Sequence, residues 1–153
     1  MPLVAALHPI AIFSIFAIGL IAGQMLAIAI ANYAARDLPE TSWTLRFQVE
    51  NALFTRTMPP SLMAPVIGLI SLCFLTRGQA REMFAIATLL GFLVLALTMA
   101  INVPINRQVQ SWTAGAAPAT WMATRDKWLW FHVVRTIAGL LSFAVAAIGL
   151  SCL

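Results

Sequence analysis

Side chains suited to chemistry gather on one face of the last apolar segment of the chain. Trp121, Trp128, His132 and Arg135 are spaced at i, i+7, i+11 and i+14, which places them on one side of a helix. His132 titrates near neutral pH when unperturbed, so it suits a general base or a metal ligand. Arg135 is permanently charged and requires an anion or several carbonyl groups nearby. A structural role suits each residue as well. His132 could be an interfacial histidine hydrogen-bonded to Glu50 or to a carbonyl, and Arg135 could form a structural ion pair.

A second polar stripe ends the preceding apolar segment. Thr98, Asn102 and Asn106 repeat every fourth residue, so they share a helix face. Pro104 stands between the two asparagines and has no N–H group. It is expected to kink or end the helix and to leave a carbonyl without its helical donor. The asparagine amides would then satisfy these backbone groups or point into a pocket.

The elements that must position these side chains are membrane spans. The chain has 153 residues, of which 61% are hydrophobic and only 9% charged, whereas a soluble domain usually has roughly 25% charged residues. No Lys, Arg, Asp or Glu occurs in residues 1–35 or 136–153. Uncharged apolar stretches of about 18 residues or more are typical of membrane spans. The composition therefore predicts an integral membrane protein with the lipid bilayer around it.

We predict an all-α fold: a single-domain integral membrane four-helix bundle over residues 1–153, with an extra short amphipathic helix between spans one and two. Pro59 and Pro60 are expected to end that short helix. The loop from Arg107 to about Ala119 is long for a bundle, which suits either a lid or a disordered connector. The predicted elements are spans at about 9–33, 60–76, 82–103 and 128–152 and a peripheral helix at about 40–56.

The depth of the polar residues follows from these spans, because about 20 residues cross the hydrocarbon core. Four spans place both termini on one side and the 36–58 and 103–127 loops on the other. Polar groups at membrane depth are costly and usually face the bundle interior or a water-filled cavity. Three different spans bring such groups into the half nearer the two loops: Gln24, Asn102, Asn106, His132 and Arg135.

A metal centre has weak support in the sequence. His132 and Glu50 are the best candidate ligands, but no spacing typical of zinc or iron sites is present. His8 is predicted at the opposite membrane face, so it cannot join His132. Cys73 and Cys152 lie in apolar runs and suit small core side chains. We therefore predict no metal site, while neither a metal nor a haem is excluded.

The charges and small residues indicate partners and orientation. The net charge is +4, but Lys and Arg are scattered over loops, so we expect no nucleic-acid partner. Most Lys and Arg residues lie in the 36–58 and 103–127 loops, which places these loops in the cytoplasm and the termini outside. Gly19 and Gly23 form a GxxxG pattern that favours close packing inside the bundle, with a homo-oligomer interface as the alternative.

One set of residues resembles a known family. The stretch Asn102-Val103-Pro104-Ile105-Asn106, followed by Trp121, Trp128, His132 and Arg135-Thr136, is similar to the anthrone oxygenase-like family of small membrane proteins. The four-span layout and the helical segment between the first two spans match as well. The resemblance implies an enzyme that oxidises an anthrone to an anthraquinone with O2 and without an organic cofactor. Many bacterial relatives have no assigned activity, and the likeness to them implies a bacterial inner membrane.

The resemblance also implies roles for the clustered residues. His132 would act as the base, while Arg135, Asn102 and Asn106 would stabilise an enolate. The substrate, a hydrophobic aromatic molecule of the anthrone or quinol kind, would contact Trp128, Trp121, Gln24 and Glu50.

Two other interpretations remain open at this point. One is a non-catalytic membrane subunit that binds a lipid or a small hydrophobic ligand, and the other is a redox protein that carries a metal or haem. An enzyme predicts a closed pocket lined by Asn102, Asn106, His132 and Arg135. A binding subunit predicts that these groups are paired with one another or exposed.

Overall fold

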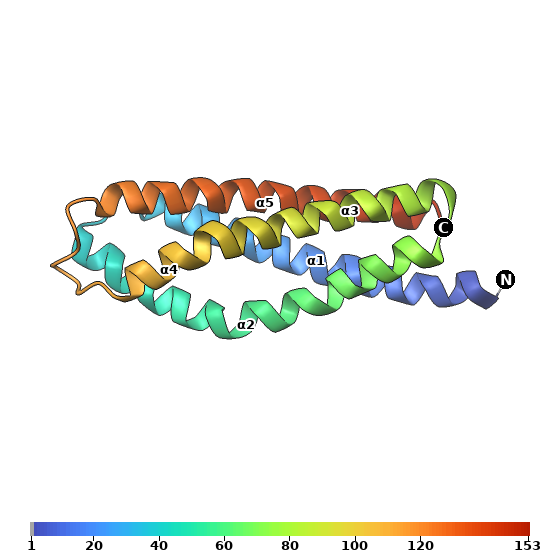
Figure 1. The fold of residues 1–153 in the computed structure, drawn as a ribbon, viewed down its shortest axis with the longest axis horizontal. Coiled ribbons are helices and arrows are strands. Elements are labelled where there is room, and N and C mark those ends of the chain that lie inside the picture. The colour runs from blue at the N-terminus through green and yellow to red at the C-terminus, as the bar shows by residue number, and fades with distance from the viewer. Residues whose placement is uncertain (1) are drawn as a thin grey trace.

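The structure is a computed structural model that describes the backbone of residues 2–153 and the side chains of residues 7–55 and 61–153. It is an all-helical bundle in which long helices run side by side (Figure 1). This confirms the predicted fold class. The elements are α1 (Pro2–Ala34), α2 (Glu40–Leu75), α3 (Gly78–Leu97), the π-helix η1 (Thr98–Asn102), α4 (Val103–Gln110) and α5 (Trp121–Ser151).

The largest difference from the prediction is in α2. Pro59 and Pro60 do not end a helix, because the predicted helix at 40–56 and the predicted span at 60–76 belong to one helix that ends at Leu75. A proline inside a helix removes one hydrogen bond and bends the axis without always ending it. Figure 1 shows that α2 bows away from the other helices in its middle. Pro59 and Pro60 lie midway along the helix Glu40–Leu75. The amphipathic segment is therefore the first half of α2.

A similar outcome is seen at Pro104. The helical path continues from α3 through η1 into α4, and the N–H of Val103 bonds to the carbonyl of Thr98 five residues earlier. A π turn of this kind inserts one extra residue and is frequent at functional sites. Pro104 lies in the first turn of α4, where its missing N–H matters least. Pro104 therefore coincides with a change in helix type and not with a helix end.

Three helical stretches are long and apolar enough to cross a membrane: Leu7–Ala34, Gly78–Gln110 and Trp121–Ser151. The second half of α2, Ser61–Leu75, is apolar but shorter. Large apolar side chains are exposed on the outside of the bundle, including Phe16 at 64% and Phe74 at 80%. A surface of this kind fits a hydrocarbon surrounding better than water.

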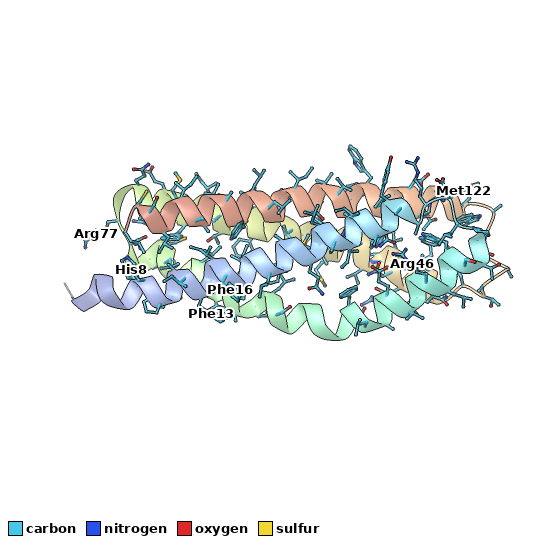
Figure 2. All side chains as sticks on the ribbon, turned by 180° about the vertical axis from the view of Figure 1, so that it is seen from behind. His8, Phe13, Phe16, Arg46, Arg77 and Met122 are labelled. Carbon is cyan, nitrogen blue, oxygen red and sulfur yellow. The ribbon has the colours of Figure 1, made fainter. Side chains whose placement is uncertain are left out.

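The two ends of the bundle differ in content. Both termini lie at one end, which we call the terminal end (Figure 1). Figure 2 shows His8 and Arg77 at this end and Met122 at the other. The other end holds the 111–120 loop, and we call it the loop end. His8 is thus remote from the start of α5, as predicted.

Aromatic side chains form the core of the loop end. Trp43 and Phe47 from α2 stack at 5.0 Å between ring centroids, and Phe47 meets Trp128 of α5 edge-on at 5.1 Å. Trp121 and Trp112 lie 5.8 and 6.5 Å from Trp43. These rings join α2, α5 and the connecting loop into one cluster.

The 111–120 loop is held against the start of α2. The backbone N–H of Gly115 donates to Oε2 of Glu40 at 2.8 Å, and Gly115 has a φ of +85° that favours glycine. Nε2 of Gln48 donates to the carbonyls of Val109 and Trp112, both at 2.9 Å. The loop is therefore docked on α2 and covers the aromatic cluster.

Candidate functional site

A cavity of about 130 Å³ lies in the loop half of the bundle, between the bowed part of α2 and the other helices. Its wall is mainly apolar, with a few polar groups, which is typical of sites for small organic molecules. The side chains that argue for chemistry are Arg135, Glu50, Asn106 and Thr98, set beside the rings of Trp128 and Phe47.

Arg135 is the only cationic side chain in the described wall of the cavity. Its Nη1 donates to Oγ1 of Thr98 at 2.9 Å, and its Nε and Nη2 lie 3.2 and 2.6 Å from Nδ1 of His132. Among the described residues, which include all five Asp and Glu side chains, no carboxylate forms an ion pair with Arg135. A guanidinium inside an apolar bundle normally has an anionic partner. Arg135 therefore presents to the cavity a positive charge whose direct hydrogen-bond partners, Thr98 and His132, are neutral.

His132 accepts hydrogen bonds from Arg135 and does not line the cavity. Because a guanidinium can only donate, Nδ1 of His132 must be the acceptor, and Nε2 must carry the proton. Nε2 then donates to the carbonyl of Met25 at 2.9 Å. His132 is fully buried and both of its nitrogens are occupied. This arrangement suits a residue that positions Arg135 and does not suit the predicted base.

The two asparagines have different places. The indole N–H of Trp128 donates to Oδ1 of Asn106 at 2.7 Å, and both residues line the cavity. Asn102 is fully buried outside the cavity wall, where its Nδ2 donates to the carbonyl of Trp128 at 3.2 Å. Its Oδ1 has no partner among the described residues. Asn106 therefore contacts the cavity directly, whereas Asn102 fixes η1 against α5.

Trp128 forms one side of the cavity. Its ring stacks on the imidazole of His132 at 4.7 Å with an interplanar angle of 14°. The bond to Asn106 holds its edge, and Phe47 contacts it at 82°. The indole is thus fixed in place and brings an aromatic side chain to the cavity wall, which suits the ring of an aromatic ligand.

Glu50 brings a carboxylate to the cavity wall. Asn32 of α1 donates to both of its oxygens at 3.3 Å, and Nη2 of Arg46 lies 3.2 Å from Oε2. Arg46 also donates to Oδ1 of Asn32 at 3.2 Å. This network of three residues holds the Glu50 carboxylate in one position. Glu50 is the only acid or base with a side chain in the described cavity wall besides Arg135.

Two of the predicted substrate contacts lie elsewhere. Gln24 is partly buried on α1 and does not line this cavity. Trp121 belongs to the aromatic cluster above the cavity, and the guanidinium of Arg125 lies 5.2 Å from its ring. Trp121 thus contributes to the cover of the site and not to its wall.

Asn32 and Phe47 were missed by the sequence reasoning. Asn32 is a single buried amide in an apolar span, which is a usable signal because such groups are costly in a membrane. Phe47 lies on the same face of α2 as Glu50, but its contact with Trp128 depends on how α2 packs against α5. No pattern in the sequence predicts that contact.

The described residues contain no group of three or more His, Cys, Asp or Glu side chains that could hold a metal ion. The predicted pair, His132 and Glu50, gains no third ligand, and both nitrogens of His132 already have hydrogen-bond partners. The hydrogen-bond donors of Arg135 and Asn106 on the cavity wall suit an organic anion.

Comparison with known proteins adds one finding. The sequence model of the anthrone oxygenase family matches residues 43–145, about two thirds of the chain. The chain belongs to the anthrone oxygenase family. Neither a curated protein nor a solved structure matches it.

Membership in the anthrone oxygenase family confirms the resemblance drawn from two motifs. One is the stretch from Asn102 to Asn106, and the other consists of Trp121, Trp128, His132, Arg135 and Thr136. The matched region contains the cavity-lining residues of α2, α3, η1, α4 and α5, while Met25 and Ile28 come from α1, outside it. The motif residues divide into two groups in space. Trp128, Asn106 and Arg135 line the cavity, and Asn102 and His132 hold them in place.

Proposed function

We propose that this protein is a membrane oxygenase that oxidises a hydrophobic aromatic compound of the anthrone or quinol kind with O2. The proposal rests on one observation: Arg135, which has no carboxylate partner among the described residues, lines a cavity together with the aromatic ring of Trp128. Such a site favours a ligand that becomes negatively charged inside it. The family supports an oxygenase-like role, and the substrate class is our inference.

The reaction balances without an external reductant. An anthrone loses a proton from a methylene group that is conjugated with its carbonyl, which gives an enolate. The enolate carbon bonds to O2, and protonation gives a hydroperoxide. Cleavage of the O–O bond, with loss of the second proton from the same carbon, forms the new carbonyl and releases water. One oxygen atom enters the quinone and the other enters water.

The geometry suggests a role for each cavity residue. Arg135 and the amide of Asn106 would stabilise the enolate oxygen, because preorganised donors act most strongly where charge develops in a dry site. Trp128 would stack on the aromatic plane. Glu50 would take the proton, since it is the carboxylate on the cavity wall. His132 would hold Arg135 in place, which replaces the base role predicted from the sequence.

Oxygen uptake by the purified full chain in nanodiscs tests this proposal. We expect wild-type protein to consume one O2 for each anthraquinone formed, faster than the spontaneous reaction. Arg135→Leu should lower kcat by about 10²- to 10³-fold, and Glu50→Gln by about 10²-fold or more. Arg107→Leu and Glu82→Gln remove charges from exposed positions outside the cavity, so they should leave turnover unchanged.

A binding measurement, combined with the oxygen uptake, tests the alternative of a non-catalytic binding subunit. The mutual pairing of His132 with Arg135 and of Trp128 with Asn106 is also what a non-catalytic binder would show. Binding is measured by quenching of tryptophan fluorescence with the anthrone under nitrogen. Binding that depends on Arg135, without any acceleration of oxygen uptake by wild-type protein, would refute the oxygenase proposal and support a ligand-handling subunit.

A further inference from the structure

A second cavity lies next to the first, deeper in the bundle. It has a volume of about 30 Å³ and is enclosed by residues of α1, α2, α3 and α5. Met25, Leu62 and Val94 line both cavities, so the two cavities are direct neighbours. The smaller cavity therefore extends from the polar site towards the terminal end.

The chemistry of this second cavity is almost purely apolar. Among the described residues of its wall, only Thr88 and Ser142 have a side-chain oxygen atom. The hydroxyl of Thr88 donates to the carbonyl of Phe84 at 2.7 Å, and that of Ser142 to the carbonyl of Ala87 at 2.8 Å. Each hydroxyl has thus used its proton within the protein. Water requires two to four polar partners, so such a cavity favours a small apolar occupant.

The size of the cavity selects the occupant. About 30 Å³ is too little for an aromatic ring system or an acyl chain, but it accommodates a diatomic molecule. Leu62 and Val66 of α2 and Gly91 of α3 line it and are partly exposed, so the cavity adjoins the outer surface of the bundle. Dioxygen is apolar and partitions from water into hydrocarbon. The hydrocarbon around the bundle can therefore supply it.

We propose that this apolar cavity binds dioxygen and conducts it from the membrane interior to the polar cavity. The binding itself follows from the shape and the dryness of the cavity. Its use as a route for the co-substrate rests on the proposed oxygenase function. Met25, Leu62 and Val94 would form the passage between the two cavities.

Gly91 lies in the cavity wall at a partly exposed position, so a side chain added there would narrow the cavity on the side that adjoins the outer surface. A Cβ added at Gly91 meets no atom within 4 Å, and the residue has no positive φ. Gly91→Ala and Gly91→Val therefore extend into free space without a backbone clash, and alanine also favours the helix. Gly23 is the matched control, because a Cβ there also meets nothing within 4 Å and the residue lines neither cavity.

The first measurement detects dioxygen without any substrate. The full chain is labelled with ¹³C in its methionine methyl groups, and relaxation is compared under dioxygen and under nitrogen. We expect dioxygen to relax the methyl of Met25, which is 2% exposed, at least as strongly as that of Met99, which is 63% exposed. Gly91→Val should remove about half or more of the effect at Met25 and leave Met99 unchanged. Gly23→Val should change neither.

The second measurement follows turnover. Gly91→Val should raise the KM for dioxygen roughly threefold or more, with the KM for the anthrone unchanged, and Gly91→Ala should have a smaller effect in the same direction. If Met25 is unaffected by dioxygen, or if its relaxation persists in Gly91→Val, the cavity is not the route and the proposal is overturned. A rise in the KM for the anthrone alone would overturn it as well, since the cavity would then hold part of the organic substrate. Absence of turnover in wild-type protein would refute the oxygenase function, whereas the relaxation data would still decide whether dioxygen binds.

Discussion

The terminal end and the loop end of the bundle are packed in opposite ways. Small side chains fill the core of the terminal end together with a few large aliphatic and aromatic ones. Its helices approach closely: a Cβ on Gly149 would lie 3.0 Å from the ring of Phe84, and one on Gly68 would lie 2.0 Å from Oγ of Ser14. The core of the loop end consists largely of Trp and Phe rings.

This difference explains where a site can form. Small residues let helix backbones approach until no free space remains. Large rings hold the helices apart at the loop end, and α2 bows away from the other helices (Figure 1). A cavity lies beside Trp128 in this half of the bundle. The loop end can therefore accommodate Arg135 and Glu50, which the terminal end has no room to solvate or pair. The terminal end acts as the anchor of the bundle and the loop end as its chemical half.

Replacing His132 at the loop end should change the stability of the bundle most. His132→Phe keeps a ring against Trp128 but leaves the guanidinium of Arg135 and the carbonyl of Met25 without their partner. We expect the free energy of unfolding to fall by about 3 kcal/mol, because hydrogen bonds to charged groups are worth about 1.5 to 3 kcal/mol each. Unfolding by SDS in mixed micelles measures this change. Gln79→Leu, at an exposed position of the terminal end, is the control and should shift stability little.

Turnover sharpens the interpretation of His132. If it positions Arg135, His132→Gln should keep part of the activity, since an amide oxygen can still accept from the guanidinium. Complete inactivity of a folded His132→Gln variant, with Glu50→Gln fully active, would instead return the base role to His132.

A change at the terminal end should have the next largest effect. Gly149→Val forces a side chain against Phe84 and Met83, so we expect a loss of about 1 to 3 kcal/mol in the free energy of unfolding. Gly23→Val is the control, because its side chain meets open space. Equal stability of the two variants would show that the terminal end is packed more loosely than the structure indicates.

The smallest expected effect concerns the aromatic wall. Trp128→Phe keeps an aromatic ring but removes the N–H that donates to Asn106, which should cost about 1 kcal/mol. The KM for the anthrone should rise, since the wall loses area and its fixed edge. Trp130→Phe is the matched control, because Trp130 is 66% exposed and lies on α5 outside the cavity wall. Similar kinetics for both variants would remove Trp128 from the substrate site.

Much of the fold was predictable because each membrane span is a continuous apolar run of the sequence. Residues 9–33, 82–103 and 128–151 fall in helices, so the last predicted span extends one residue beyond α5. The face shared by Trp128, His132 and Arg135 is the one that turns inwards. The helix through Pro59 and Pro60 was not predictable. Local rules favour a break at two prolines, whereas packing of both halves of α2 against the bundle keeps the helix continuous.

By itself, the sequence determined the helical bundle, the family and the set of polar residues on α5 and its neighbours, because helical periodicity and hydropathy depend on local order along the chain. Only the tertiary structure decided which of those residues meet the cavity. Arg135 and Asn106 reach it, while His132 and Asn102 are turned to partners on α1 and α5. That choice depends on how α2 bows and how four helices are rotated against one another, and these are contacts between residues far apart in the chain.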